Sequence, residues 1–79
     1  MGMPTIFKID GYRFFFFSNE HFPEHVHVEK GDSYARIELE SLIVTDSYNF
    51  NSKELKIVSK IIQENYTQLK GAWDEYFKK

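Results

Sequence analysis

Cysteine is absent from the chain, and proline and glycine are scarce, with two and four residues respectively. Without cysteine, so small a fold cannot be stabilised by disulfides, and a thiol nucleophile is excluded. The glycines are scattered rather than grouped in a phosphate-binding loop, so we predict no nucleotide cofactor and no other cofactor. There is also no apolar run long enough to span a bilayer, and no export signal at the amino terminus. We therefore expect a cytoplasmic protein that does not associate with membranes.

A basic excess is lacking as well, because 10 Lys and Arg stand against 12 Asp and Glu, for a net charge of −2 with neutral histidines. Proteins that bind nucleic acids on their own usually carry positive charge, since contacts to phosphates dominate their affinity. The lysines near the carboxy terminus are interleaved with acidic residues, which is typical of a solvated helix face. We predict no autonomous DNA binding, whereas RNA binding is left open.

Aromatic residues, by contrast, are abundant, with eight Phe, five Tyr and one Trp among 79 residues. A chain of this length forms one domain with a modest core, and large rings supply much of the burial available to it. We expect a single domain over residues 1–79. Met1-Gly2 precedes a second start-like pair, Met3-Pro4, and is interpreted as an extension.

The amino-terminal part predicts a β-hairpin. Asp10-Gly11 favours a two-residue turn between strands over residues 5–9 and 12–17. That turn sets the cross-strand pairs Ile9 with Tyr12, Lys8 with Arg13, Phe7 with Phe14, Ile6 with Phe15, and Thr5 with Phe16. The second strand is then apolar on both faces at its far end. We expect Phe15 and Phe17 to lie either under a loop or against a partner.

A second hairpin is predicted from the strict alternation over residues 25–29. Val26 and Val28 should face a core, while His25, His27 and Glu29 share the opposite face. Residues 30–33 form a tight connection to a strand over residues 34–39. In that register His27 lies opposite Arg36, and His25 opposite Glu38.

The second half of the chain predicts a helix from residue 52 to residue 77, where apolar residues recur every three or four positions. Asn51 is the predicted N-cap, with Glu54 completing a variant of the capping box. A straight helix of this length would measure about 39 Å, against about 17 to 20 Å for an average strand. It must therefore overhang the sheet or break near Asn65 or Gly71.

The fold predicted from these elements is an α+β domain. It has a four-stranded, mostly antiparallel sheet of two hairpins, with the carboxy-terminal amphipathic helix, continuous or broken in two, packed on one face. Residues 42–44 are a candidate for a short fifth strand, and residues 45–49 are predicted as a loop.

The histidine face offers two kinds of chemistry. Histidine as a residue type titrates near neutral pH, so His25 and His27 could act as acid and base, and Arg13 and Arg36 on the same face could hold a phosphate. Together they fit the catalytic residues of a metal-independent endoribonuclease. The simpler interpretation is that the histidines are ordinary surface residues paired with carboxylates such as Glu38.

A divalent-metal site is the second alternative, because residues i and i+2 of a strand place both imidazoles on one side. The candidate ligands are His25, His27 and Glu29. The third position stays open among Glu29, Glu38, His21 and Glu24. A histidine pair alone does not define a specific site, since three or four ligands are needed.

Protein contacts are predicted at the aromatic residues that the fold does not obviously bury. The candidates for partner binding are Phe15, Phe17, Trp73 and Tyr76, the last two at the end of the helix. They indicate a protein partner or a homo-oligomer.

Several motifs resemble those of a known family. They are Met3-Pro4-Thr5-Ile6, Gly11-Tyr12-Arg13-Phe14-Phe15-Phe16, Ser18-Asn19-Glu20, His25-Val26-His27-Val28, Phe50, Glu54-Leu55, and the ending from Trp73 to Phe77. With these motifs the chain resembles the bacterial family called domain of unknown function 4160, over nearly its whole length from Met3. It differs at His21-Phe22-Pro23-Glu24, where members often have a proline pair before the first histidine, and its residues 41–49 are atypical.

The resemblance implies a small bacterial protein, often encoded beside a second small protein in an arrangement like a toxin–antitoxin pair. No catalytic residue is established in the family, so none is transferred to this chain. We therefore expect a protein-binding or regulatory module of such a gene pair. The endoribonuclease and the metal-binding domain are the alternatives.

Overall fold

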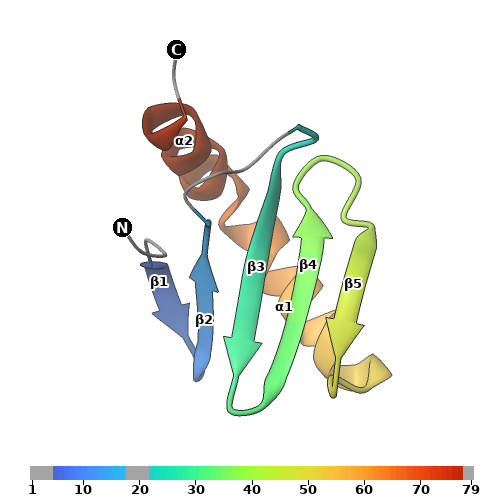
Figure 1. Ribbon diagram of the computed structural model, residues 1–79. Helices are drawn as coiled ribbons and strands as arrows, with labels where there is room; N and C mark the ends of the chain where they lie inside the picture. The colour runs from blue at the N-terminus through green and yellow to red at the C-terminus, as the bar shows by residue number, and fades with distance from the viewer. Residues whose placement is uncertain (1–4, 18–21, 78–79) are drawn as a thin grey trace.

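A computed structural model describes residues 5–17 and 22–77. Its elements are β1 (Thr5–Ile9), β2 (Tyr12–Phe15), β3 (His25–Lys30), β4 (Ser33–Glu38), β5 (Val44–Tyr48), α1 (Ser52–Glu64) and α2 (Tyr66–Tyr76). The strands form one antiparallel sheet in the order β1-β2-β3-β4-β5. Figure 1 shows α1 crossing one face of this sheet, with α2 at the end where β2 stops and β3 begins. The α+β class is confirmed.

The prediction of four strands is wrong, because β5 adds a fifth over Val44–Tyr48. The predicted loop over residues 45–49 is wrong, because most of it belongs to this strand, and of the candidate strand over residues 42–44 only Val44 is included. Four of the five residues of β5 are exposed. The strand is held instead by backbone pairing with β4, which places Asp46 opposite Arg36 and Tyr48 opposite Tyr34. An irregularity between Arg36 and Ile37 accommodates the extra residue Thr45.

The first hairpin forms around the predicted turn, where Asp10 and Gly11 have φ of 52° and 84°. Three predicted pairs next to this turn are confirmed, from Ile9 with Tyr12 to Phe7 with Phe14. The pairs Ile6 with Phe15 and Thr5 with Phe16 are wrong. A register shift between Thr5 and Phe7 places Thr5 opposite Phe15, and β2 ends at that residue.

The core lies between the sheet and the helices, and Val26 and Val28 face it as predicted. Phe14 of β2, Ala35 and Ile37 of β4, Val58 and Ile62 of α1, and Leu69 and Trp73 of α2 are also buried in it. Because side chains alternate along a strand, His25 and His27 lie on the opposite face of β3.

The predicted helix breaks at Asn65, one of the two positions considered, and continues through Gly71. The Asn65 side chain amide donates a hydrogen bond to the carbonyl oxygen of Ile61, at 2.8 Å, within the last turn of α1. The break redirects the chain so that α2 brings Leu69 and Trp73 into the core. In the described ranges, no helix is long and apolar enough to cross a membrane.

The start of α1 carries the predicted capping box. The backbone N–H of Glu54 donates to Asn51 Oδ1 at 2.8 Å, and the backbone N–H of Asn51 donates to Glu54 Oε1 at 3.1 Å. We expect Asn51→Ala to lower the free energy of unfolding by about 1 kcal/mol, since it leaves an amide at the helix start without its acceptor. Urea unfolding followed by circular dichroism measures this, with Lys53→Ala in the same turn as the control. Equal stability of the two variants would contradict the role given to the cap.

Candidate functional site

The histidine pair is buried. His25 is 2% exposed and His27 is 3% exposed, so the interpretation of both as ordinary surface residues is wrong. The predicted cross-strand neighbours are confirmed, with Glu38 opposite His25 and Arg36 opposite His27. The face of the sheet opposite α1 therefore carries its own cluster of enclosed side chains.

Aromatic rings enclose His27. Its ring stacks on Phe15 of β2, at 5.4 Å between centroids, and on Tyr34 of β4, at 5.9 Å. Phe17 meets it edge-on at 4.3 Å. His27 Nδ1 lies 2.8 Å from the Tyr34 hydroxyl oxygen, within hydrogen-bond distance. A buried imidazole is thus supplied with both ring contacts and a polar partner, as burial of a polar group requires.

His25 joins this cluster to α2. Its Nδ1 lies 2.8 Å from the carbonyl oxygen of Pro23, and because a carbonyl only accepts, that nitrogen carries the hydrogen and donates it. The His25 ring lies 5.1 Å from the ring of His27 and 5.4 Å from that of Trp73. The hydrogen bond to Pro23 therefore sets the orientation of an imidazole that packs against the second helix.

A cation on α2 reinforces this junction. Lys70 Nζ donates to Asp74 Oδ1 at 2.9 Å and to Glu24 Oε2, just before β3, at 3.0 Å. Both hydrogen bonds raise the pKa of Lys70 above its ordinary value, and the bond to Asp74 has the larger effect. The ammonium group consequently stays charged throughout the neutral range and connects α2 to the start of β3.

The two candidate arginines differ in their contacts. Arg13 has partners for its guanidinium group. Its Nη1 donates to Glu29 Oε1 at 2.6 Å, and its Nε donates to Thr5 Oγ1 at 3.0 Å. The guanidinium also lies 4.3 Å from the centroid of the Phe15 ring. Arg36 lies opposite His27, and its Nε is enclosed without a hydrogen-bond partner among the described residues. The structure thus brings His25, His27 and Arg36 to one face of the sheet, and commits Arg13 to an ion pair with Glu29.

No metal ligand set is found in the described part of the chain, where no group of three His, Asp or Glu side chains is arranged to hold an ion. Glu29 is paired with Arg13, and Glu24 accepts from Lys70. His21, one of the candidate ligands, lies outside the described residues.

The four predicted partner-binding residues divide into two groups. Phe15 and Trp73 are buried, so their rings support neighbouring side chains rather than face solvent. Phe17 is 38% exposed and Tyr76 is 46% exposed. A fifth ring, Phe22, is 71% exposed and packs 6.1 Å from Trp73, and it is not among the residues predicted from the sequence. The signal was present as a large apolar residue in a turn segment next to Pro23, where burial is not expected.

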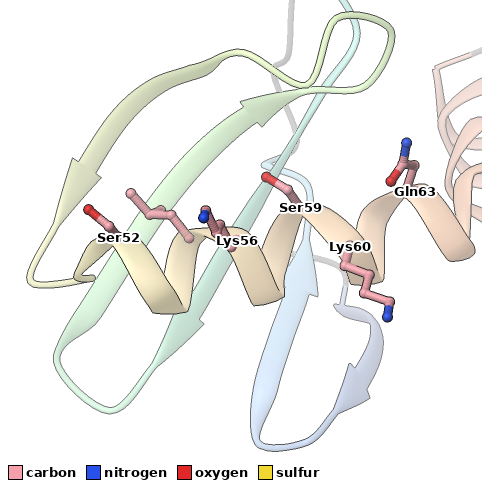
Figure 2. A pocket seen from close by; sticks show the side chains of 6 residues that line it. Ser52, Lys56, Ser59, Lys60 and Gln63 are labelled. Carbon is pink, nitrogen blue, oxygen red and sulfur yellow. The ribbon is translucent and has the colours of Figure 1, made fainter.

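The surface of the described residues is hollowed in places. One hollow, of about 430 Å³, lies where the start of β1 meets α2 and is lined by Thr5, Ile6, Phe16, Ala72, Glu75 and Tyr76. Another, of about 570 Å³, follows one side of α1 and is lined by Ser52, Leu55, Lys56, Ser59, Lys60 and Gln63 (Figure 2). The second is shallow and contains none of the predicted site residues, so it offers no support for chemistry.

This fold and site therefore define a class of protein: a small α+β domain with a histidine pair buried under aromatic rings. The family model described as domain of unknown function DUF4160 matches residues 11–74. Because this match covers most of the chain, the protein belongs to that family, which confirms the resemblance seen in its motifs. No curated protein and no solved structure matches the chain.

Proposed function

We propose that this protein is a protein-binding, regulatory module of a two-gene pair of the toxin–antitoxin kind. Its binding site would be the surface of the exposed rings of Phe17, Phe22 and Tyr76, which are connected to the buried Trp73 directly or through neighbouring rings and are here called the aromatic end. The proposal concerns binding rather than catalysis.

The observation that carries the proposal is the gathering of exposed rings at one end of the fold. Large exposed apolar side chains in the described residues are Phe17, Phe22, Ile43, Tyr48, Ile57 and Tyr76, and half of these belong to the aromatic end. Phe22 contacts Trp73 directly. Phe17 is connected to Trp73 through the two histidines, because Phe17 contacts His27, His27 contacts His25, and His25 contacts Trp73. Tyr76 packs on Phe77, which in turn contacts Trp73 at 4.5 Å. Exposed rings fixed on a buried support are typical of binding hot spots, because little side-chain entropy remains to be lost.

The groove between β1 and α2 extends this surface. Phe16 and Tyr76 line it together with Ile6 and Ala72, and Thr5 and Glu75 supply polar groups. A mainly apolar groove with a few polar groups suits the insertion of an apolar side chain from a partner.

The endoribonuclease alternative is less well supported by the contacts on the histidine face. A general acid or base must reach the proton that it transfers, and both imidazoles are enclosed by neighbouring side chains. Arg13 is paired with Glu29. The buried Arg36 Nε, which has no hydrogen-bond partner among the described residues, is the observation that favours an anion near His27. The proposal therefore gives His25 and His27 a structural role beneath the aromatic end.

Co-purification tests the proposal. The protein is co-expressed with the tagged product of its neighbouring gene, as wild type, as the double variant Phe17→Ser/Tyr76→Ser, and as the control Ile57→Ser. Ile57 lies on α1 and is 39% exposed, nearly the same as Phe17. We expect the wild type and the control to co-purify with the partner and the double variant to lose it, since hot-spot rings each contribute about 2 kcal/mol or more. Equal recovery of the double variant would refute the assignment of the aromatic end.

A further inference from the structure

The sheet has two edges, and they differ in how they are protected. β1 carries the exposed Lys8 and the irregularity between Thr5 and Phe7, both of which discourage pairing with another strand. β5 has neither lysine, arginine nor proline within Val44–Tyr48, and four of its five residues are exposed. Figure 1 shows β5 at the margin of the sheet, with α1 passing behind the sheet and its first turn projecting past the lower end of β5. An edge of this kind is a template for another strand.

The register indicates which backbone groups of β5 face outward. The two-residue turn Gly31-Asp32 closes on Lys30 and Ser33, which makes them a hydrogen-bonded pair, and such pairs alternate along an antiparallel ladder. The backbone groups of residues 34, 36 and 38 on β4 therefore face β5. The hydrogen bond from the Glu38 N–H to the Ile43 carbonyl, at 2.9 Å, agrees with this. Since Asp46 and Tyr48 lie opposite Arg36 and Tyr34, the N–H and C=O of Ser47 point out of the sheet.

We propose that β5 pairs antiparallel with β5 of a second copy of this chain, about a two-fold axis between the two Ser47 residues. The outward N–H and C=O of each Ser47 then bond to those of the other, and the two sheets become one. In this register Asp46 of each copy lies opposite Tyr48 of the other.

The two-fold register with a second copy avoids repulsion between like charges. Asp46 is the one charged residue of β5, and the two-fold register sets it against a tyrosine rather than against another aspartate. Tyr48 is 66% exposed in the single chain, and the pairing covers its ring on the same face as Asp46. On the helix side Ser47 meets Ser47, where small side chains leave the strands free to approach.

Proline at residue 47 is the variant that separates edge pairing from other association. Proline has no backbone N–H, and the N–H of Ser47 faces solvent in the single chain. Ser47→Pro therefore leaves the hydrogen bonds to β4 intact and removes the central hydrogen bonds to the second copy. We expect sedimentation to show a dimer for the wild type and for Ser47→Ala, and a monomer for Ser47→Pro with an unchanged circular dichroism spectrum. A monomeric wild type, or a dimer that survives Ser47→Pro, would overturn the proposal.

Disulfide trapping tests the register, and it is clean because the chain has no cysteine. The α carbons of a hydrogen-bonded pair lie about 5.5 Å apart, within disulfide range, whereas residues displaced by two positions lie about 7 to 8 Å apart. Ser47→Cys should therefore form covalent dimers on mild oxidation, well in excess of Tyr48→Cys and of Lys53→Cys on α1. Equal or greater trapping of Tyr48→Cys would contradict the two-fold axis at Ser47. These outcomes do not depend on the aromatic end, because none of its residues belongs to β5.

Discussion

Replacement of Trp73 by alanine is expected to lower the free energy of unfolding by about 3 to 5 kcal/mol, the usual cost of removing a large buried ring. Trp73 and Leu69 are the buried residues of α2. The indole packs edge-on against Phe16 at 5.3 Å and lies 5.4 Å from His25, so it connects α2 to β3 and to the residue that follows β2.

Such a loss is a large fraction of the total, because domains are stable by only about 5 to 15 kcal/mol. The Trp73→Ala variant should therefore be substantially unfolded near 37 °C. Tyr76→Ala, three residues further along the same helix, is the control and should cost much less because its ring is half exposed. Circular dichroism in urea is the measurement, since the variant lacks the only tryptophan. A change below about 1 kcal/mol would show that Trp73 does not hold α2 to the sheet.

His27→Ala is expected to cost about 2 to 4 kcal/mol, because it removes a buried ring and also the hydrogen-bond partner of Tyr34. The ring is stacked between Phe15 and Tyr34, so the space that it leaves is bordered by side chains from two other strands. Collapse of that space would require β2 and β4 to move together, which their pairing to β3 opposes.

His27→Phe is the matched control for this prediction. It keeps a ring of similar size between Phe15 and Tyr34 and loses the contact between Nδ1 and the tyrosine hydroxyl, so we expect a cost of about 1 kcal/mol. Urea unfolding of both variants at neutral pH measures the difference. If phenylalanine costs as much as alanine, then the hydrogen bond to Tyr34, rather than the ring packing, stabilises this face.

The same pair of variants matters for any test of catalysis. An alanine at residue 27 confounds loss of chemistry with loss of folding, whereas a phenylalanine removes the imidazole and retains the packed ring. An activity that survives His27→Phe is not due to an acid or base at this position.

Local signals in the sequence were sufficient for the parts of the fold that rest on side-chain pattern. Asp10-Gly11 specified the first turn, alternation specified β3 and β4 and their register, and Asn51 with Glu54 specified the start of α1. Each of these is determined by residues close together in the chain. The family likeness follows from the same motifs.

The remaining features depend on tertiary contacts. β5 has no apolar alternation because it is an exposed edge strand held by backbone hydrogen bonds. Backbone hydrogen bonds do not require particular side chains, so the sequence does not reveal them. The irregularity near Ile6 likewise has no residue signature. Alternation placed His25 and His27 on one face correctly, but it could not show that this face is enclosed. Their burial comes from Phe17, Tyr34 and Trp73, and Trp73 reaches His25 only because the helix breaks at Asn65.

The most direct test of the proposed function is the affinity of the purified protein for the product of its neighbouring gene, measured by titration calorimetry. Three proteins are compared: wild type, His27→Phe and Phe17→Ser/Tyr76→Ser. We predict that His27→Phe binds as tightly as the wild type, and that the double variant binds at least about 100-fold more weakly, since two hot-spot rings are removed. Binding that is lost in His27→Phe but kept in the double variant would contradict the account, because the histidine face rather than the aromatic end would then be the functional surface.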